Sequence, residues 1–278
     1  MKRFLALVAA AWLGGAAPSH AACGEDTGAC SIEMGTYHAR LPEAPVKGAI
    51  LYLHGFGGSG EGALRPKDWV NTALDRGYVL IAPDGLPYAE GRGRGWSFIP
   101  GRPKLRDEPA FLQAVRDDAA ARFGFAAERV ILSGFSIGGS MTSYMACDVP
   151  DSFAAYAPVA GGFWRPHPTD CAGPVRLLHT HGWTDGTVPL EGRVLRGHDV
   201  TDPEALVQGD IFYTLRMWRE VNACNQLRAD RYVTKGDFMR RAWDRCADGS
   251  ALEFALFPGG HVVPQGWAGM MLDWYEGL

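Results

Sequence analysis

One serine of the chain lies among glycines at a spacing that suits nucleophilic catalysis. Gly134-Phe135-Ser136-Ile137-Gly138 has the pattern G-x-S-x-G; it follows the apolar run 129–132 and precedes a helical stretch that ends near Cys147. A strand, a sharp turn and a helix in this order lift a serine hydroxyl clear of a sheet. The sequence therefore predicts that Ser136 is a nucleophile. A glycine-rich turn that binds a phosphate is the alternative interpretation of these residues.

A serine hydroxyl needs a base, and in this arrangement the histidine follows the serine in the chain. The histidines after Ser136 are His167, His179, His181, His198 and His261. His261 is preferred because it comes directly after the last apolar run, 252–257, and because two glycines before it allow the loop to bend. His179 and His181 are expected to be structural, and the other two histidines have no strand before them.

The acid that orients this histidine should leave a strand end between Ser136 and His261. Asp185 meets this requirement because it follows the apolar run 175–178. The aspartates that fail the requirement are Asp84, Asp148, Asp151 and Asp170. We therefore predict a catalytic triad of Ser136, Asp185 and His261.

The oxygen of a tetrahedral intermediate needs backbone N–H donors. One donor is predicted at Ile137, the residue after the nucleophile. The other is predicted in His54-Gly55-Phe56-Gly57-Gly58, which follows the apolar run 46–53 and is similar to oxyanion loops of the HGGG type. Phe56 N–H is the preferred donor and Gly57 N–H the alternative. The His54 side chain is expected to brace the loop, and simple packing is the other interpretation of this histidine.

The elements that must position these residues alternate along the chain. The predicted strands are 46–53, 78–82, 129–132, 153–159, 175–178 and 252–257, and the predicted helices are 68–76, 109–123, the stretch ending near 147, 211–221 and 265–275. Continuously apolar strands separated by helices predict an α/β fold with a mostly parallel sheet covered on both faces. Since no repeat and no long linker divides the chain, one catalytic domain over 22–278 is expected.

The first 21 residues are expected to be a secretory signal peptide that is removed. Two basic residues precede the apolar run 4–17, which is short for a membrane span, and small residues follow it. Cleavage is predicted after Ala21, with Ala22 as the alternative. Lipid attachment to Cys23 is not expected, because His20 stands where a lipidation signal usually has an aliphatic residue. The protein is therefore predicted to be exported, periplasmic or extracellular, with no stable membrane anchor.

Six cysteines in an exported protein indicate disulfide bonds. Fifteen connectivities are possible, and proximity along the chain favours the pairs Cys23–Cys30, Cys147–Cys171 and Cys224–Cys246. A zinc site is disfavoured because no cysteines stand two to four residues apart beside histidines. His179 and His181 share one face of a strand and could bind a metal, but no third ligand is near in the sequence. No metal and no other cofactor is predicted.

The composition excludes several classes of protein. The formal charge is −4, and it becomes −6 without the signal segment, so there is no basic excess for binding nucleic acid. Aromatic residues make up 11% of the chain, which together with the modest charge excludes a disordered protein.

Together the motifs resemble the polyhydroxybutyrate depolymerase-like serine esterases of the α/β-hydrolase superfamily, which also include feruloyl and acetyl-xylan esterases. The motifs that carry the resemblance are Leu53-His54-Gly55-Phe56-Gly57-Gly58-Ser59, Gly134-Phe135-Ser136-Ile137-Gly138-Gly139, Ala157-Pro158-Val159-Ala160-Gly161-Gly162, His181-Gly182-Trp183-Thr184-Asp185 and Gly259-Gly260-His261. The resemblance implies an α/β-hydrolase fold and a serine carboxylesterase with the triad given above. Trp183 departs from the family pattern, which has a small residue before the acid.

The expected function is hydrolysis of short polyester oligomers or related esters through an acyl-enzyme. Large members of the family carry an additional domain that binds solid polymer, and none is expected here. The alternatives are a carbohydrate esterase of the feruloyl or acetyl-xylan type, a serine peptidase of the same superfamily and, least expected, a binding module without catalysis. The partner is an ester substrate, small or oligomeric.

Aromatic and basic residues near the motifs are candidates for the substrate pocket. Trp96, Trp164 and Trp183 are expected to contact substrate, and packing in the core is the alternative for each aromatic residue, Phe98, Phe163 and Trp267 included. The loop 91–106 carries five basic residues: Arg92, Arg94, Arg102, Lys104 and Arg106. A solvated surface loop is the preferred interpretation, and attraction of an acidic substrate is the alternative.

Overall fold

A ten-stranded sheet runs through the computed structural model, which describes residue 23 and residues 28–65, 67–88, 91, 93–202 and 205–278. Its strand order is β1-β2-β4-β3-β7-β8-β9-β14-β13-β12. The six central strands are parallel: β4 (Tyr78–Pro83), β3 (Gly48–Leu53), β7 (Val130–Phe135), β8 (Ala155–Val159), β9 (Arg176–Gly182) and β14 (Ala251–Phe257). The outer strands are antiparallel: β1 (Cys30–Ile32), β2 (Gly35–Arg40), β13 (Phe238–Trp243) and β12 (Arg231–Lys235).

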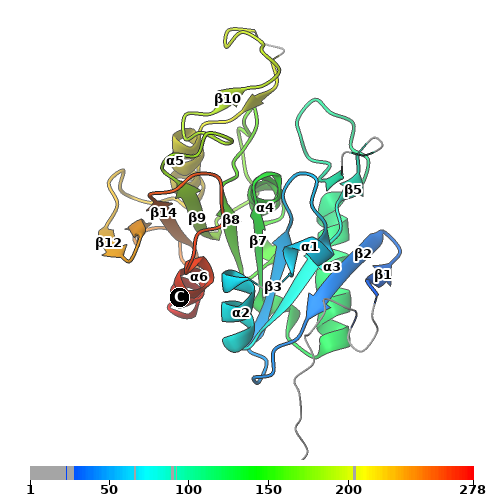
Figure 1. Ribbon diagram of the computed structural model, residues 1–278. Coiled ribbons are helices and arrows are strands. Elements are labelled where there is room, and N and C mark those ends of the chain that lie inside the picture. Colours follow the sequence, from blue (N-terminus) through cyan, green and yellow to red (C-terminus); the bar gives the residue numbers. More distant parts are fainter. Residues whose placement is uncertain (1–22, 24–27, 66, 89–90, 92, 203–204) are drawn as a thin grey trace, which may run out of the picture.

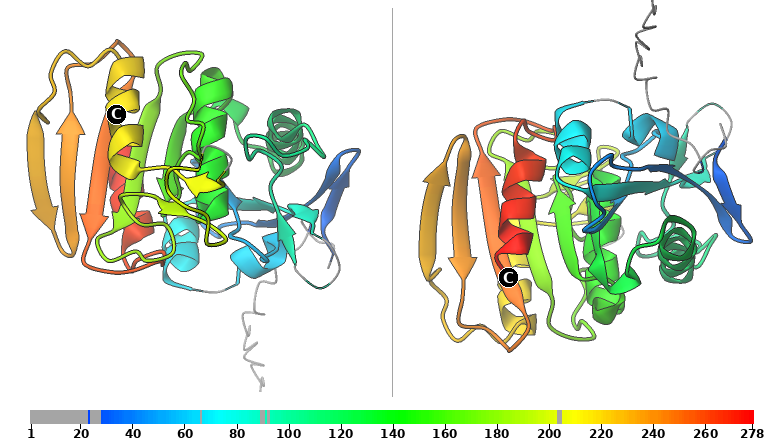
Figure 2. Two further views of the ribbon diagram at one scale, coloured as in Figure 1. Left: turned by 90° about the horizontal axis from the view of Figure 1, so that it is seen from above. Right: turned by 90° about the horizontal axis from the view of Figure 1, so that it is seen from below.

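Helices cover both faces of this sheet (Figure 2). One face carries α2 (Asp68–Asp75) and α6 (Trp267–Glu276), which pack against each other. The other carries α3 (Glu108–Phe123), α4 (Ile137–Asp148) and α5 (Ile211–Val221). Each face has its own apolar core: Trp69 and Met271 belong to the first, and Phe111 and Trp218 to the second. Strands with apolar residues on both sides can only be stable between two such layers.

The helix ends follow local chemistry. The Asp107 carboxylate accepts a hydrogen bond from Ala110 N–H at the start of α3, and Asp210 accepts one from Tyr213 N–H at the start of α5. Helix α3 ends at Gly124, whose φ of +72° suits glycine. Local side chains and a glycine thus define these helix ends.

The carboxyl ends of the parallel strands share one edge of the sheet, and the predicted motifs follow β3, β7, β9 and β14 at that edge. Two small hairpins rise beside it (Figure 1): β5 (Leu86–Pro87) with β6 (Arg94–Gly95), and β10 (Arg193–Val194) with β11 (Val207–Gln208). The short helix α1 (Gly60–Ala63) and the 3-10 turns Ala127–Arg129 and Pro150–Ser152 complete the elements. The edge therefore gathers loops that are far apart in the sequence.

The predicted fold class and the mostly parallel sheet are confirmed, with differences in the strands. The prediction of a strand from residue 153 is wrong by two residues, because a 3-10 turn precedes β8. Strand β9 continues to Gly182, so both His179 and His181 lie within it. The four antiparallel outer strands were not predicted from the sequence. Every residue of β12 is exposed, so no apolar pattern marks it.

The three predicted disulfides are confirmed as Cys23–Cys30, Cys147–Cys171 and Cys224–Cys246. No helix in the described ranges is long and apolar enough to cross a membrane. The predicted signal peptide, 1–21, lies outside the described residues.

Candidate active site

Ser136 lies at the turn between β7 and α4 with a φ of +59°, a conformation that non-glycine residues rarely adopt. The glycines on either side allow the turn to pack tightly. A Cβ at Gly134 would lie 2.5 Å from Gly138 O, and a Cβ at Gly138 would lie 2.2 Å from Leu53 O. The turn therefore requires glycine at both positions and presents the Ser136 hydroxyl beside the N-terminus of α4.

Ser136, His261 and Asp185 form one hydrogen-bonded chain. The distance from Ser136 Oγ to His261 Nε2 is 2.8 Å, and the distance from His261 Nδ1 to Asp185 Oδ2 is also 2.8 Å. A carboxylate can only accept, so His261 Nδ1 carries a proton and Nε2 is left to accept from the serine. The structure thus brings together the three residues predicted as the triad.

Two neighbouring strands align the acid and the histidine. The parallel ladder between β9 and β14 continues into the loops, where Trp183 N–H donates to Phe257 O and Thr184 N–H donates to Gly259 O. A Cβ at Gly182 would lie 2.3 Å from Gly260 O, so this close approach depends on glycine. The two loops are therefore held together immediately before Asp185 and His261.

The Asp185 carboxylate is buried and receives several hydrogen bonds. Its Oδ1 accepts from Thr187 N–H at 2.9 Å and Val188 N–H at 2.8 Å, while Oδ2 faces His261. Burial alone would raise the pKa of this carboxyl, but the hydrogen bonds from His261 and Val188 outweigh burial and lower the pKa below its usual value. Asp185 is therefore held as a carboxylate.

A buried pair of histidines lies behind this acid. His181 Nε2 donates to Val188 O at 2.8 Å, so its Nδ1 accepts from His179 Nε2, 3.0 Å away. Burial lowers the pKa of both rings. The two histidines hold the acid loop through Val188, and His181 Nε2 lies 3.5 Å from Asp185 Oδ2. Among the residues that the structure describes, no three histidines, cysteines or acids cluster as metal ligands.

The loop after β3 is fixed by His54. Gly85 N–H donates to His54 Nε2 at 3.0 Å, so the proton is on Nδ1, which donates to Gly55 O at 2.8 Å. Burial lowers the pKa of this imidazole, which keeps it neutral. Trp96 Nε1 donates to His54 O at 3.0 Å. The ring braces the loop, as the sequence predicts.

The remaining amides of this loop differ in their partners. Gly57 N–H donates to Arg94 O at 2.9 Å, and Gly58 N–H donates to Gly55 O at 3.1 Å. Phe56 N–H has no hydrogen-bond partner in the part of the chain that is described, and Ile137 is the first residue of α4, where a helix leaves its N–H groups unpaired. Phe56 N–H and Ile137 N–H therefore remain the predicted donors to an oxyanion.

An apolar pocket of about 580 Å³ opens beside Ser136 and Ile137. Trp96, Trp164 and Phe98 line it, as do Leu195 and Leu206 from the segment that joins β10 to β11. Trp183 is 59% exposed and lies in the lining of neither pocket that adjoins the triad. Phe163 and Trp267 are fully buried and belong to the cores.

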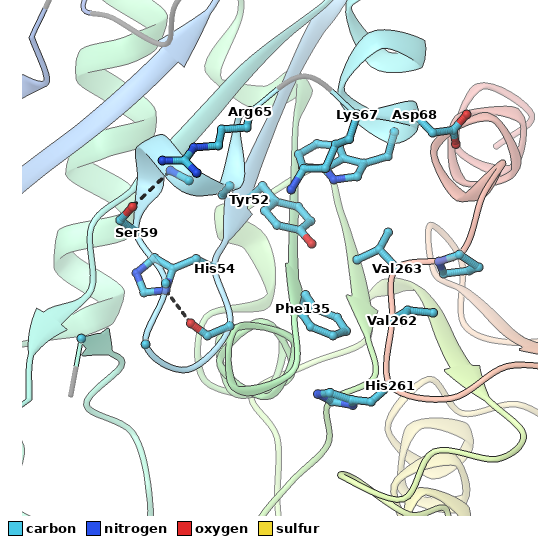
Figure 3. A pocket seen from close by; sticks show the side chains of 18 of the residues that line it. Tyr52, His54, Ser59, Arg65, Lys67, Asp68, Phe135, His261, Val262 and Val263 are labelled. Atoms are coloured by element: carbon cyan, nitrogen blue, oxygen red, sulfur yellow. Dashed lines mark hydrogen bonds between the residues drawn. The ribbon is translucent and has the colours of Figure 1, made fainter. Parts of the chain in front are cut away.

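A second pocket, of about 970 Å³, lies on the side of His261 that is nearer to α2 (Figure 3). Its walls include Gly55 and Gly57 of the loop after β3, the Phe135 ring, and Val262 and Val263. Phe135 and His261 contact each other with ring centroids 4.7 Å apart. His261 therefore lines this larger pocket, whereas Ser136 lines the apolar one.

The basic residues of the loop 91–106 have different surroundings. Arg106 pairs with Glu108 and lies over the Phe111 ring, so it is structural. Arg94 donates to Gly85 O, Arg102 lines the apolar pocket, and Lys104 lines neither pocket beside the triad. Arg92 is outside the described residues.

Several residues of the site were missed by the sequence reasoning. The amides of Thr187 and Val188 that hold Asp185 could have been found, because Asp-Gly-Thr is typical of a turn in which the aspartate accepts from the backbone two residues on. Arg193, Arg196 and Gln208 line the apolar pocket from the β10–β11 hairpin. Nothing in the sequence marks that hairpin, since its strands have two residues each.

The chain is similar to known proteins in sequence and in fold. The family model for the alpha/beta hydrolase fold matches residues 48–254. The protein therefore belongs to the alpha/beta hydrolase fold family.

Two proteins that are named as esterases have sequences similar to this chain. A protein named "Putative esterase NocK", from Nocardia uniformis subsp. tsuyamanensis, is 36% identical over 160 residues, which cover 55% of this chain and 43% of that protein. Feruloyl esterase B of Piromyces equi is 26% identical over 166 residues, which cover 55% of this chain and 28% of that protein. The chain thus spans less than half the length of either relative.

The fold is also similar to solved structures. The acetyl xylan esterase from Aspergillus awamori superposes with a TM-score of 0.59 at 15% sequence identity, over 87% of this chain and 93% of that one. The resemblance to α/β-hydrolase esterases of the feruloyl and acetyl-xylan group is confirmed. The narrower resemblance to polyhydroxybutyrate depolymerases stays a prediction.

Proposed function

We propose that the protein is a serine carboxylic-ester hydrolase that uses Ser136, His261 and Asp185. The observation that carries the proposal is the unbroken hydrogen-bond chain from Ser136 Oγ through the imidazole to the Asp185 carboxylate. The same constellation of groups performs acyl transfer on several unrelated folds. The similarity to proteins named as esterases supports this choice.

In the proposed reaction, Ser136 Oγ bonds to the ester carbonyl carbon while His261 Nε2 takes the hydroxyl proton. Phe56 and Ile137 N–H groups donate to the carbonyl oxygen as it becomes negative. His261 then gives the proton to the alcohol oxygen, the C–O bond breaks, and an acyl-enzyme remains. Water, activated by the same imidazole, releases the acid and restores the serine. Asp185 stabilises the imidazolium in both halves.

The substrate class is best supported as an ester of the carbohydrate-esterase type. Feruloyl esterase B of Piromyces equi is a relative, and a pocket beside Ser136 with Trp96, Phe98 and Trp164 in its walls suits a flat acyl group. This reading is favoured over the polyester oligomers expected from the sequence. Export, in line with the three disulfides, is part of the proposal.

The test is hydrolysis of p-nitrophenyl acetate and of a feruloyl sugar by the full chain and by Ser136→Ala. The variant removes the nucleophile, so kcat should fall by about a million-fold. A fluorophosphonate probe should label the wild type at Ser136 and leave the variant unlabelled. Ser143→Ala, in the interior of α4, is the matched control and should be labelled at the wild-type rate. Undiminished turnover by Ser136→Ala would refute the mechanism, and absence of labelling in the wild type would favour a binding module.

A further inference from the structure

The two pockets beside the triad suit different parts of an ester substrate. His261 Nε2 must donate a proton to the departing oxygen, so the leaving alcohol lies within hydrogen-bond reach of that nitrogen. His261 and Phe135 line the larger pocket, whereas Ser136, Ile137 and Phe56 line the apolar one. On the proposed mechanism the acyl group therefore occupies the apolar pocket, and the alcohol occupies the larger pocket.

The larger pocket carries positive charge at its far end. Arg65 and Lys67 lie across the pocket from His261, with the rings of Tyr52 and Phe135 between them (Figure 3). Lys67 Nζ lies over the Trp69 ring, 5.5 Å from its centre. No carboxylate of the described chain lies within ion-pair distance of either cation. Both charges are therefore available to a ligand.

Two further charged side chains of this pocket, Asp68 and Arg94, hydrogen-bond to the backbone. The Asp68 carboxylate accepts a hydrogen bond from Gly266 N–H at 2.8 Å. Arg94 donates to Gly85 O at 3.1 Å, and its Nε is 3.9 Å from Asp84 Oδ1. Arg65, Lys67 and Arg94 outnumber Asp68, the single carboxylate in the described part of this lining, so the pocket attracts anions although the chain as a whole is acidic.

We infer that the pocket beside His261 binds a leaving alcohol that carries a carboxylate, with Arg65 and Lys67 as its recognition groups. The inference rests on the proposed esterase function and adds the chemical class of the alcohol. A hydroxy acid and an acidic sugar share this chemistry. Such a substrate would place its ester between Ser136 and the oxyanion amides and its carboxylate at the far end of the pocket.

The test compares two acetyl esters that differ in one charge: 4-acetoxybenzoate and its neutral amide, 4-acetoxybenzamide. The measured quantity is the ratio of kcat/KM for the anionic ester to that for the amide. In the double variant Arg65→Gln/Lys67→Met this ratio should fall about fivefold or more, because two partly exposed charges are removed. In the wild type the ratio should also fall as salt is added. Lys235→Met, in the edge strand β12, removes a similar exposed charge and should keep the wild-type ratio.

The outcomes separate the two proposals. If the wild type hydrolyses both esters but the double variant keeps the wild-type ratio, the alcohol assignment is wrong and the esterase proposal stands. If neither ester nor p-nitrophenyl acetate is hydrolysed, the esterase proposal itself fails. Acetyl esters of 3-hydroxybutyrate and of glucuronic acid, each beside its amide, distinguish a hydroxy acid from an acidic sugar. The inference would be overturned if, for every acid–amide pair, the kcat/KM ratio of Arg65→Gln/Lys67→Met equalled that of Lys235→Met.

Discussion

At the scale of single residues, the site depends on fixed protonation states. The carbonyl and carboxylate oxygens around His54, His181 and His261 can only accept, so each ring has one defined tautomer. Asp185 in turn is held as an anion by N–H donors that compensate its burial. These states exist before a substrate arrives, and a prearranged site needs little reorganisation during the reaction.

The catalytic role of Asp185 can be separated from its contribution to folding. In Asp185→Asn the side-chain oxygen can still accept from the Thr187 and Val188 amides, so the loop should keep its shape. The His261 tautomer would no longer be fixed, and kcat should fall about ten-thousand-fold. Steady-state kinetics with p-nitrophenyl acetate, beside a urea titration, measures both effects. Asp84→Asn is the comparison, and a larger loss of kcat in that variant would assign the acid to Asp84.

At the scale of elements, Asp84 joins three parts of the fold next to the site. Its carboxylate accepts from Thr36 Oγ1 in β2 and from Gly60 N–H at the start of α1, each at 2.9 Å, and lies 3.4 Å from His38 Nε2. Burial would raise the pKa of Asp84, but these hydrogen bonds outweigh burial and hold the pKa well below its usual value. The end of β4 is thereby tied to β2 and to α1, which directly follows the loop after β3.

This tie predicts a dependence of stability on pH. Because folding lowers the pKa of Asp84, its contribution is full above the ordinary carboxyl pKa of about 3.9 and is lost as pH falls through the lower folded value. Asp84→Asn should lower the free energy of unfolding by about 1–3 kcal/mol at pH 7 and by less at pH 3. Urea titrations at both pH values measure this. An equal loss at pH 7 and pH 3 would show that the charge of Asp84 does not matter.

At the scale of the whole molecule, the candidate active site is built from loops at one edge of the sheet. Disulfides join the segments that surround it. Cys147 at the end of α4 is joined to Cys171, which precedes β9, and Cys224 after α5 is joined to Cys246 after β13. These bridges connect the helical layer that carries Ser136 to strands that carry the acid and the histidine. The layers are thus linked covalently as well as by their core.

Removal of one bridge should lower stability without removing the triad. Cys147→Ala/Cys171→Ala opens a loop of 24 residues and should cost about 3 kcal/mol, mainly through greater freedom of the unfolded chain. Cys23→Ala/Cys30→Ala opens a loop of 7 residues and should cost less, about 2 kcal/mol. Urea unfolding of both variants tests the order. A larger loss in the second variant would contradict the loop-length argument.

The amino-acid sequence by itself determined the central strands, the layer arrangement and the three residues of the candidate triad. Apolar strands carry a strong signal because both of their sides are buried, and glycines mark turns that tolerate no side chain. The order serine, acid, histidine along the chain, together with a position directly after a strand, then selects the acid and the base. The outer strand β12 and the hairpin β10–β11 carried no such signal, because exposed or very short strands have no period to detect.

Only the tertiary structure decided which groups face one another. It separated Phe56 N–H from Gly57 N–H, since the latter is bonded to Arg94 O, a residue far along the chain. It also placed His181 Nε2 3.5 Å from Asp185 Oδ2, with Ser136 lining one pocket and His261 lining another. Cavities and the hydrogen bonds between separate loops depend on distances that the sequence does not set, so no local pattern specifies them.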